Sequence, residues 1–401
     1  MRRKGKKGLR ILFLAVIIIV LAALASEIMV KNAPKPQAEV NVAISEKEGP
    51  FALPAVSRRI PEFFETYTFE DSTTNDLASG DFDKDGYPEL FVGNFDAQNY
   101  LFLNNKNKTF SPMDFFGIQK TASVAIADFN NDGNLDVAIG NYGDVNLLFV
   151  DSGNLSFTKK EEFMETRTKD NKVNIMVVSD FNNDGYKDLA VIRNNQQNYL
   201  FINNKDGSFT LSKQFEIGNF NDAVWADFDS DGFADLLVAG YNQQSHIYYN
   251  SGTGKGRLFD RVDFGNISKI RGVDAADFNL DGLPDVAVAN YGQQNYLYLN
   301  KGNRTFTRVD AFGKGNSIDI VSADLNNDNW PDAIVANYNE MSYIYYNNGC
   351  NFDNCSFTEA PLTYGYSHTF EVLDYDKDGD MDIAVGRYSD KTTLFNNLLI
   401  R

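Results

Sequence analysis

The chain has 401 residues, and its 55 acidic side chains outnumber its 37 basic ones, so the formal net charge is −18. Nucleic-acid-binding domains are normally basic, so this balance argues against DNA or RNA as a partner. The two cysteines form a C-x4-C pair without a second pair, a pattern that does not indicate zinc.

Residues 1–30 differ from the rest of the chain. Six basic residues lie between Arg2 and Arg10, and an uninterrupted apolar run follows at Ile11–Ala25. This order is typical of an export signal. Two interpretations stay open: a signal peptide cleaved after Ala25, or a single-pass transmembrane anchor that extends to Val30. In both, the basic end stays inside and the remainder lies outside the cytoplasmic membrane, anchored or secreted.

Residues 31–60 contain four prolines among mixed polar and charged residues. This composition predicts a linker or stalk. The remaining segment, 61–401, is long enough for one large core and is predicted to be a single domain.

A short acidic pattern recurs seven times between residues 81 and 382. It reads Asp-x-[Asp/Asn]-x-Asp-[Gly/Asn]-x-x-[Asp/Glu], and successive copies begin 47 to 52 residues apart. A period of about 50 residues is typical of propellers and similar repeat arrays. Ordinary turn propensity explains Asp, Asn and Gly in one loop, but it does not require an acid at the ninth position of every copy. The pattern therefore indicates a ligand as well as an architecture.

The spacing of the acids is that of a calcium-binding loop. Positions 1, 3 and 5 place side-chain oxygens on one side of a tight turn, position 7 offers its carbonyl, and position 9 supplies a closing carboxylate. Position 6 needs a positive φ, which glycine adopts at little cost. Hard oxygen ligands favour Ca²⁺ over zinc or copper. The predicted calcium ligands are Asp81, Asp83, Asp85 and Glu89; Asp128, Asn130, Asp132 and Asp136; Asp180, Asn182, Asp184 and Asp188; Asp227, Asp229, Asp231 and Asp235; Asp277, Asn279, Asp281 and Asp285; Asp324, Asn326, Asp328 and Asp332; and Asp374, Asp376, Asp378 and Asp382.

Two loops depart from the pattern, and the charge of the set supports a cation. The first loop closes with the longer Glu89, and the sixth has Asn329 where the others have glycine. Asparagine tolerates a left-handed conformation better than most residues, so the turn at Asn329 is expected to form. The loops hold 24 carboxylates that repel one another without ions. Seven calcium ions add fourteen positive charges and change the net charge from −18 to −4.

Short apolar runs flank every loop. Runs such as "SVAIADF" precede the loops and runs such as "DVAIGNY" follow them, and third and fourth runs resemble "NYLFINN" and "GSFTLSKQF". Apolar, β-branched and aromatic runs between Gly, Asn and Asp turns are typical of strands. No segment of the repeats has a helical period. The sequence therefore predicts an all-β, seven-bladed propeller with four antiparallel strands per blade, preceded by one N-terminal hydrophobic helix.

The last repeat lacks a fourth strand of its own. It ends with "TTLFNNLLIR", whereas the segment Glu62–Asp71 before the first loop matches the fourth-strand runs. We expect this segment to complete the seventh blade, because the pairing covers an otherwise open sheet edge.

The cysteines, Cys350 and Cys355, flank the turn between the third and fourth strands of the sixth repeat. A disulfide across this hairpin fits an oxidising compartment. Two free thiols remain the alternative.

A Phe-Gly pair recurs between the repeats and carries a family resemblance. It occurs at Phe116-Gly117, Phe264-Gly265 and Phe312-Gly313, with Tyr364-Gly365 as a variant. With these pairs and the acidic loops, the chain resembles the FG-GAP and VCBS repeat proteins. The resemblance implies the calcium-loop propeller found in the head of integrin α subunits. Members of the family include adhesins, lectin-like binders and accessory domains of enzymes, so the resemblance leaves the partner open.

An aromatic residue recurs in the turn between the second and third strands, on the face opposite the acidic loops, and glutamines accompany it. Aromatic faces and amides suit a sugar or a polar peptide, whereas packing between blades is the alternative role. The third repeat has Asn195 at this position. The candidate ligand-binding residues are Phe95, Tyr142, Tyr241, Tyr291, Tyr338 and Tyr388.

The sequence predicts no catalytic site. His246 and His368 lie in different repeats, no G-x-S-x-G motif is present, and the paired carboxylates are assigned to the calcium loops. The sequence therefore favours an exported, calcium-stabilised binding or adhesion module with a carbohydrate or protein partner. An envelope scaffold subunit and an extracellular polysaccharide-acting enzyme are the alternatives.

Overall fold

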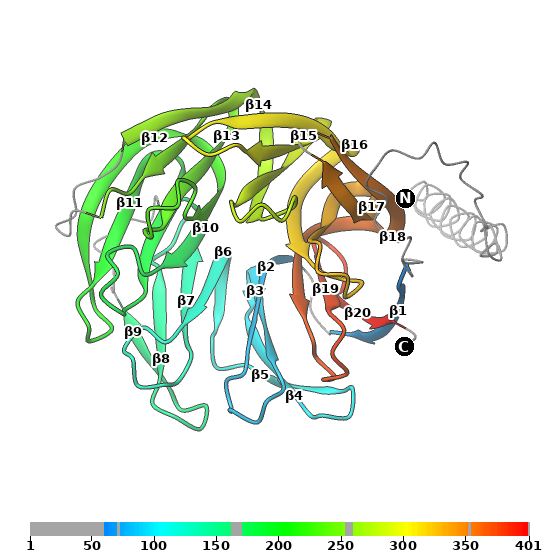
Figure 1. Cartoon of the computed structure of the whole chain (residues 1–401). Helices are drawn as coiled ribbons and strands as arrows, with labels where there is room; N and C mark the ends of the chain where they lie inside the picture. Colours follow the sequence, from blue (N-terminus) through cyan, green and yellow to red (C-terminus); the bar gives the residue numbers. More distant parts are fainter. Residues whose placement is uncertain (1–59, 70–72, 162–170, 253–259, 352–353, 400–401) are drawn as a thin grey trace, which may run out of the picture. The chain divides into compact units, whose positions relative to one another are not determined.

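The computed structural model describes residues 60–69, 73–161, 171–252, 260–351 and 354–399 (Figure 1). All of them belong to one compact unit, Arg58–Arg401. The described residues form twenty β-strands and no helix. None of the described segments is therefore a helix of the length and apolarity needed to cross a membrane. The predicted signal or anchor at residues 1–30 and the predicted linker at 31–60 lie outside the described residues, apart from residue 60.

The strands follow the predicted apolar runs in chain order. In the first part of the chain they are β1 Glu62–Thr68, β2 Thr74–Gly80, β3 Glu89–Gln98, β4 Tyr100–Asn104, β5 Phe110–Met113, β6 Ile118–Ala127, β7 Asp136–Asn141, β8 Leu147–Asp151, β9 Phe157–Glu161 and β10 Val173–Ser179. In the second part they are β11 Asp188–Asn203, β12 Phe209–Ala226, β13 Asp235–Tyr249, β14 Asp260–Ala276, β15 Asp285–Asn300, β16 Phe306–Ala323, β17 Asp332–Asn351, β18 Asn354–Leu373, β19 Asp382–Arg387 and β20 Thr393–Leu398.

All strand pairs are antiparallel, and each acidic loop joins two paired strands. In the first repeat β2 pairs with β3, β3 with β4, and β4 with β5. The second repeat has the same order from β6 to β9. The four-stranded antiparallel unit that the sequence predicts is thus present in these repeats.

The third to sixth repeats use longer strands than the sequence predicts. The first part of β11 pairs with β10, from Ser179 opposite Asp188, and its second part pairs with β12, from Asn203 opposite Phe209. The second and third predicted strands are therefore one bent element. The next strands continue from one repeat into the following one. The first part of each pairs within its own repeat, and its last part pairs with the second strand of the next repeat, as seen in β12, β14, β16 and β18. The extended backbone continues through the connections that the sequence assigned to turns.

The first strands of successive repeats lie side by side around an axis. β2 contacts β6, β6 contacts β10, and the same order continues through β12, β14, β16 and β18. β18 in turn contacts β2, which closes the circle. β1 pairs with β20, with Glu62 opposite Leu398 and Thr68 opposite Thr393. The predicted pairing of this segment with the last repeat is confirmed over Glu62–Thr68.

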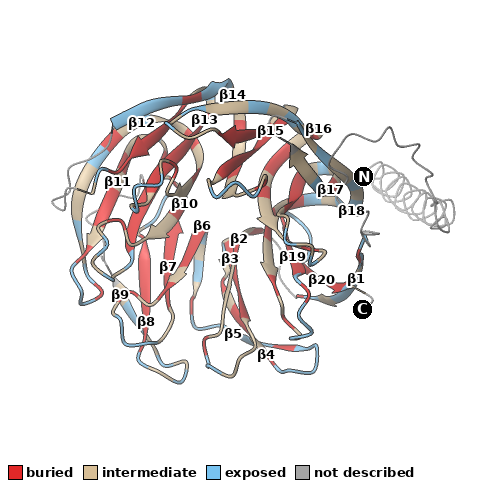
Figure 2. Cartoon of the chain, viewed as in Figure 1, coloured by how far each residue is buried: buried red, intermediate tan, exposed pale blue. Residues whose placement is uncertain are grey.

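The core lies between neighbouring repeats. Six-residue stretches of the second strands, such as β7, are buried along their whole length, whereas β14 carries exposed residues near its start (Figure 2). One cluster packs Leu77 and Phe102 of the first repeat against Leu373 and Leu394 of the last. Burying an apolar side chain of this size stabilises the fold by about 1.5–3 kcal/mol. Each repeat therefore depends on its neighbours for stability.

The Phe-Gly pairs have a structural role at the start of the connections between repeats. Phe116, Phe264 and Phe312 are buried, and their glycines have φ between 59° and 77°. A Cβ on Gly313 would lie 2.5 Å from the Tyr345 hydroxyl. Glycine is needed there for the backbone conformation and for the close approach. In the variant pair, Tyr364 is exposed.

Candidate functional site

The seven acidic loops share one hydrogen-bonded geometry. In the loop at Asp128, the backbone N–H of Gly133 donates to Asp128 Oδ2 over 2.7 Å, and that of Asn134 donates to Asp132 Oδ1 over 2.8 Å. The corresponding bonds, from position 6 to position 1 and from position 7 to position 5, occur in every loop. The backbone thus holds the side chains of positions 1 and 5 on the inner side of each turn.

Two positions of each loop have left-handed backbone. The six glycines at position 6 have φ between 87° and 90°, and Asn329 has φ 68°. The expectation that Asn329 preserves the turn is therefore confirmed. Position 4 is also left-handed in every loop, including Lys84 at 60° and Leu280 at 56°. The sequence gives no sign of this second turn, because position 4 has no fixed residue type.

The acid at position 9 is a buried anchor. The carboxylate of Asp285 accepts the backbone N–H of Phe278 over 3.0 Å and that of Asn300 over 2.7 Å. It therefore ties the loop to the end of the third strand, a role that the sequence analysis missed. Burial, with a smaller contribution from the nearby loop acid Asp281, raises the pKa of Asp285 to about 7. The buried negative charge of the loop needs a compensating cation or proton.

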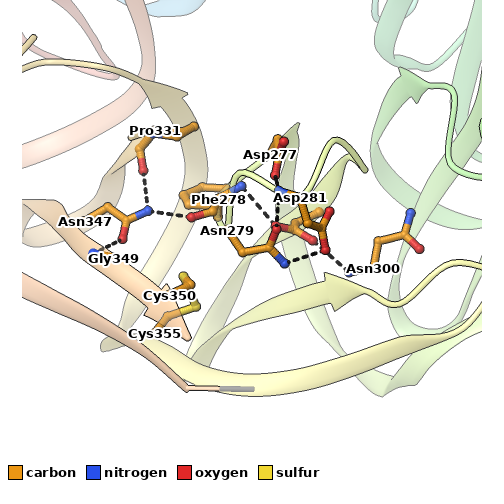
Figure 3. Close-up of a disulfide and its surroundings, with 11 residues drawn as sticks. Asp277, Phe278, Asn279, Asp281, Asn300, Pro331, Asn347, Gly349, Cys350 and Cys355 are labelled. Atoms are coloured by element: carbon orange, nitrogen blue, oxygen red, sulfur yellow. Dashed lines mark hydrogen bonds between the residues drawn. A yellow bond between two sulfur atoms is a disulfide. The ribbon is translucent and has the colours of Figure 1, made fainter. Parts of the chain in front are cut away.

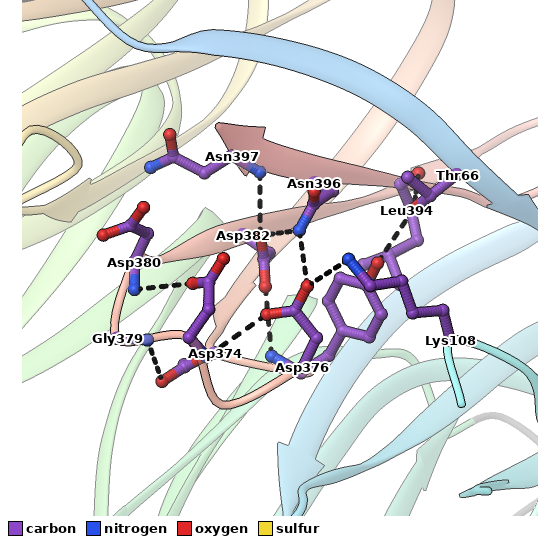
Figure 4. A network of polar contacts seen from close by, with 12 residues as sticks. Thr66, Lys108, Asp374, Asp376, Gly379, Asp380, Asp382, Leu394, Asn396 and Asn397 are labelled. Carbon is purple, nitrogen blue, oxygen red and sulfur yellow. Dashed lines mark hydrogen bonds and ion pairs between the residues drawn. The ribbon is translucent and has the colours of Figure 1, made fainter. Parts of the chain in front are cut away.

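In three loops the carboxylates converge closely enough to hold one ion. Three carboxylate oxygens lie within 4.8 Å of one another in each. An all-oxygen set of this kind fits Ca²⁺. The three groups are Asp81, Asp83 and Asp85; Asp227, Asp229 and Asp235; and Asp374, Asp376 and Asp382. The loop at Asp374 carries two more acids, Asp378 and Asp380, and the backbone N–H of Asp380 donates to Asp378 Oδ1 (Figure 4).

Among the described residues, basic side chains form ion pairs with acids of four loops, and the sequence analysis did not predict these pairs. In Figure 4, Lys108 reaches into the loop at Asp374 from another repeat. The nitrogen–oxygen distances run from 2.7 to 3.3 Å. A bound cation would compete with these ammonium and guanidinium groups for the same oxygens. The pairs are Lys106 with Asp85, Lys108 with Asp376, Lys205 with Asp184, and Arg304 with Asp229.

The disulfide lies beside the loop at Asp277 (Figure 3). Cys350 and Cys355 are joined, with their Cα atoms 4.0 Å apart. Nearby, the Asn347 side chain donates to the carbonyl of Phe278 in the preceding repeat over 2.9 Å and to that of Pro331 over 3.1 Å. The hairpin that carries the disulfide is thus tied to the loop of the repeat before it.

The six candidate aromatic residues gather at two adjoining cavities on the axis. A cavity of about 300 Å³ is lined by Phe95 and Tyr142 among others. A second, of about 510 Å³, is lined by four tyrosines, one from each of the last four repeats. The two cavities share Arg271, Ile318 and His368. The tyrosines of the second cavity are Tyr241, Tyr291, Tyr338 and Tyr388.

The structure corrects the assignment for the third repeat. Asn194, not Asn195, lines the axial cavity. Asn195 has φ 51°, and it corresponds to Asp96, with φ 60°, in the first repeat. Asn194 lies six residues after the closing acid Asp188, as Phe95 does after Glu89, so the spacing of the repeat itself places Asn194 at this position.

The glutamines beside the aromatic residues bind the backbone. Gln98 Nε2 donates to the carbonyls of Asn99 and Asp114, both over 2.8 Å. Gln243 Oε1 accepts the N–H of Asn219 over 2.9 Å, and Gln293 does the same for Lys269. These amides therefore fasten the strands of the repeats.

Carboxylates on the first strands form a second feature that the sequence analysis missed. Asp222 Oδ2 accepts the N–H of Val273 in the next repeat over 2.8 Å, and Glu371 Oε1 accepts that of Ser79 over 2.9 Å. We call these residues the axial carboxylates: Asp76, Asp222, Asp274, Asp319 and Glu371. Burial raises the pKa of Asp76 to about 7, of Asp222 to about 8, of Asp319 to about 6 and of Glu371 to about 7.

The two histidines lie in different environments. His368 lines both axial cavities, and its Nδ1 is 3.0 Å from the carbonyl oxygen of Asn75. Burial lowers the pKa of His368 to about 4, so its ring is neutral at pH 7. His246 is buried on β13, with Nε2 3.4 Å from Glu216 Oε1. No histidine of the described residues lies in an acidic loop.

The protein is a β-propeller. Its antiparallel sheets are arranged in a circle, and each acidic loop lies on the hairpin between the first and second strands of a repeat. A family model, the FG-GAP-like repeat, matches residues 81–139, 180–238, 227–288, 277–335 and 324–385, and all seven acidic loops lie within these segments. The chain belongs to the FG-GAP repeat family. No curated protein matches it.

Solved structures with similar folds have little sequence identity to the chain. BBS1N, in its complex with ARL6DN, has a TM-score of 0.59 and 14% identity, over 84% of this chain and 97% of that one. A lectin from Agrocybe aegerita that recognises non-reducing terminal N-acetylglucosamine has a TM-score of 0.54 and 20% identity, over 80% of this chain and 87% of that one. At these identities the likeness shows the fold alone.

Proposed function

We propose that the chain is an exported, calcium-stabilised propeller of seven blades that acts as a binding or adhesion module. The ligand site is the pair of axial cavities, and the ligand is a carbohydrate. The observation that carries this proposal is the gathering of six aromatic side chains, from six repeats, at two cavities that share residues.

Strand pairing supports the seven blades. β2–β5 and β6–β9 each make a four-stranded sheet, and β18, β19, β20 and β1 pair in that order. Between these units, the strands from β10 to β18 pair consecutively in chain order. The long strands contribute one part to one repeat and the other part to the next repeat or the next pairing of the same repeat. With one acidic loop per unit, the seven loops correspond to seven blades.

Calcium is proposed as a structural ion. The common loop geometry, the convergence of carboxylates and the buried acid at position 9 support it. An ion at each loop rigidifies the hairpin between first and second strands. The axial cavities are lined by none of the loop residues, so calcium acts on ligand binding only through the fold.

Export is proposed from the basic and apolar pattern of residues 1–30. The disulfide between Cys350 and Cys355 supports an oxidising compartment. The module therefore acts outside the cytoplasmic membrane, attached to it or released.

A carbohydrate ligand suits the chemistry of the cavities. Tyrosine rings present broad apolar faces and a polar hydroxyl, which match the two sides of a sugar ring. A volume of about 510 Å³ lies within the range of small-molecule sites. The similar Agrocybe aegerita lectin recognises a terminal sugar, which agrees with this choice.

The test is a glycan-array screen of the purified full chain, with calcium and with chelator. We expect calcium-dependent binding to a defined sugar class, and loss of that binding in Tyr241→Ala and Tyr291→Ala. Tyr296→Ala, on the same strand as Tyr291 but outside the cavity lining, is the control and should bind normally. Absence of binding in both conditions would contradict a carbohydrate ligand. If a pull-down from envelope extract then recovered one protein, that protein would replace the carbohydrate as the proposed ligand.

An enzyme is the second candidate, because titratable groups converge on the axis. Asp222 and Asp319 have raised pKa values and share a cavity with His368 and Arg271, and such groups are common in active sites. Their oxygens, however, already accept backbone N–H groups, which favours a structural role. Release of reducing sugar from a bound glycan, lost in Asp319→Asn, would support the enzyme.

A further inference from the structure

The larger axial cavity has an unusual charge for this protein. Its lining consists of four tyrosines, Ile318, His368 and Arg271. Arg271 is the one residue of that lining with a full charge at pH 7, since burial keeps His368 neutral. In a chain of net charge −18, the lining of this cavity therefore carries one positive side chain and no acidic one.

Arg271 has no partner among the described residues. Its Nε is buried and lacks a hydrogen-bond acceptor, and no described carboxylate lies within ion-pair distance of its guanidinium. Arg304, by contrast, binds two aspartates. Arg271 is half-buried. A cation that is partly removed from water without a counterion is costly, and burial lowers the pKa of Arg271. The group is therefore available for an anion from outside.

The axial carboxylates do not supply that anion. Asp76, Asp222 and Asp319 line the neighbouring cavity, not this one. Each of the three accepts one N–H from its own strand and one from the next repeat. Their oxygens are engaged in holding the repeats together. Arg271 also lines that neighbouring cavity, but no ion pair or hydrogen bond joins it to any of the three among the described residues.

The guanidinium and the tyrosines select one kind of ligand. A guanidinium binds a carboxylate through two parallel hydrogen bonds, with a strength and geometry that an ammonium does not provide. The four tyrosine rings offer apolar faces and hydroxyls for the rest of the molecule. The matching ligand carries a carboxylate on a ring that is apolar on its faces and hydroxylated at its edge.

We propose that this cavity binds an acidic sugar of the uronic acid type, with Arg271 holding the carboxylate and the tyrosines packing against the ring. The inference rests on the proposed carbohydrate-binding function and adds the class of sugar. It assigns to Arg271 a role as specificity-determining residue.

The experiment uses a matched pair of probes, methyl β-glucuronide and methyl β-glucoside, which differ only in having a carboxylate or a hydroxymethyl group. Binding to the full chain with calcium is followed by saturation-transfer NMR and calorimetry at millimolar sugar. Hydrogen bonds to charged groups contribute about 1.5–3 kcal/mol, so we expect the glucuronide to bind roughly 10- to 100-fold more tightly. Arg271→Gln should remove this preference.

Two further variants keep the result interpretable. Arg308→Gln changes an arginine outside the cavity lining and should bind both sugars as the wild type does. Arg271→Lys keeps the charge without the two-pronged geometry, and it should retain a preference below 10-fold. This variant also decides the matter should Arg271→Gln fail to fold, as judged by its melting curve.

Equal binding of both sugars, lost in Tyr291→Ala, would overturn the acidic-sugar inference and leave the carbohydrate function standing. Displacement of the glucuronide by acetate at equal concentration would also overturn it, because the carboxylate alone would then be the ligand. If neither probe binds, the inference is wrong, and the glycan array decides separately whether the carbohydrate function is wrong as well.

Discussion

An asparagine at the end of the third strand ties most repeats to the loop before them. Asn203 Nδ2 donates to the carbonyl of Phe129 over 2.7 Å, and Asn300 Nδ2 to that of Phe228 over 2.8 Å. The same bond is made by Asn104, Asn250, Asn347 and Asn397. The second repeat has Asp151 in this place, and its buried Oδ2 has no hydrogen-bond partner among the described residues. In the other repeats the amide nitrogen at this place donates to a carbonyl, and a carboxylate oxygen cannot make that bond.

We predict that Asp151→Asn stabilises the protein, because the new N–H₂ group can donate to the carbonyl that the other asparagines reach. Satisfying a buried polar atom contributes about 1–3 kcal/mol, so urea denaturation should show an increase of that order. Asp144→Asn, in an exposed turn of the same repeat, should change little. An unchanged or lower midpoint for Asp151→Asn would contradict this account.

At the scale of the strand, the axial carboxylates link each first strand to the next. Asp222 and Asp319 lie five residues before the first acid of a loop, at equivalent places in their repeats. Each borders the axial cavity and is therefore only half-buried by accessible surface. The surrounding protein nevertheless raises the pKa of both carboxyl groups. Their protonation is therefore coupled to the stability of the ring of first strands.

The pH dependence of this coupling has a definite sign. Burial raises the pKa of Asp222 from its ordinary 3.8 to about 8. Between these values the folded protein holds a proton that the unfolded chain has lost, so the free energy of unfolding falls as pH rises. In Asp222→Asn this contribution is absent, and the decrease in melting temperature from pH 5 to pH 8 should be smaller than in the wild type.

The control for Asp222→Asn is Asp310→Asn, which changes an exposed aspartate and should preserve the wild-type slope. The comparison uses differences between variants, because the buried acids of the calcium loops contribute equally to all of them. An identical slope in Asp222→Asn and wild type would show that Asp222 does not take up a proton on folding.

At the scale of the whole molecule, the proposed calcium ions would act on the ring as a set. All seven acidic loops lie on hairpins of neighbouring repeats that share their cores, such as the cluster of Phe129 and Leu148 with Val191 and Phe201. Loss of one of the proposed ions would therefore weaken the packing on both sides of that repeat. Ions that bind only the folded state stabilise it by mass action.

We predict that removing calcium with a chelator lowers the melting temperature substantially. A single site held at 100 times its dissociation constant contributes about 2.7 kcal/mol, and several sites act together. Differential scanning calorimetry of the full chain measures the change, and calcium re-addition should restore the original curve. Magnesium is the matched control and should restore it poorly, because it prefers a smaller octahedral shell. A melting curve that is the same in excess chelator would rule out the calcium assignment.

The repeating features could be predicted from the sequence, and the features made by single residues could not. The loops, the strand runs and the pairing of β1 with β20 follow from a period that is visible residue by residue. Arg271 could not be predicted as a site residue from the sequence. The equivalent position, six residues before the first acid of a loop, holds Asn75 in the first repeat and His368 in the last, so no repeated residue type marks it. Only the folded ring brings these unlike residues to one axis. The assignment of Asn195 was wrong by one position, because Asn194 is the residue that lies six positions after the closing acid of its loop, as the aromatic residues do in the other repeats.

The pairing of β1 with β20 also sets an order of events during synthesis. Glu62 finds its partner only when Leu398, more than three hundred residues later, has been made. Contacts so distant in sequence form slowly, because a long loop must close before they stabilise anything. Until then the growing chain carries an unpaired sheet edge, which is prone to associate with other chains. The export proposed above would therefore require machinery that tolerates or shields an open ring until the last strand has been made.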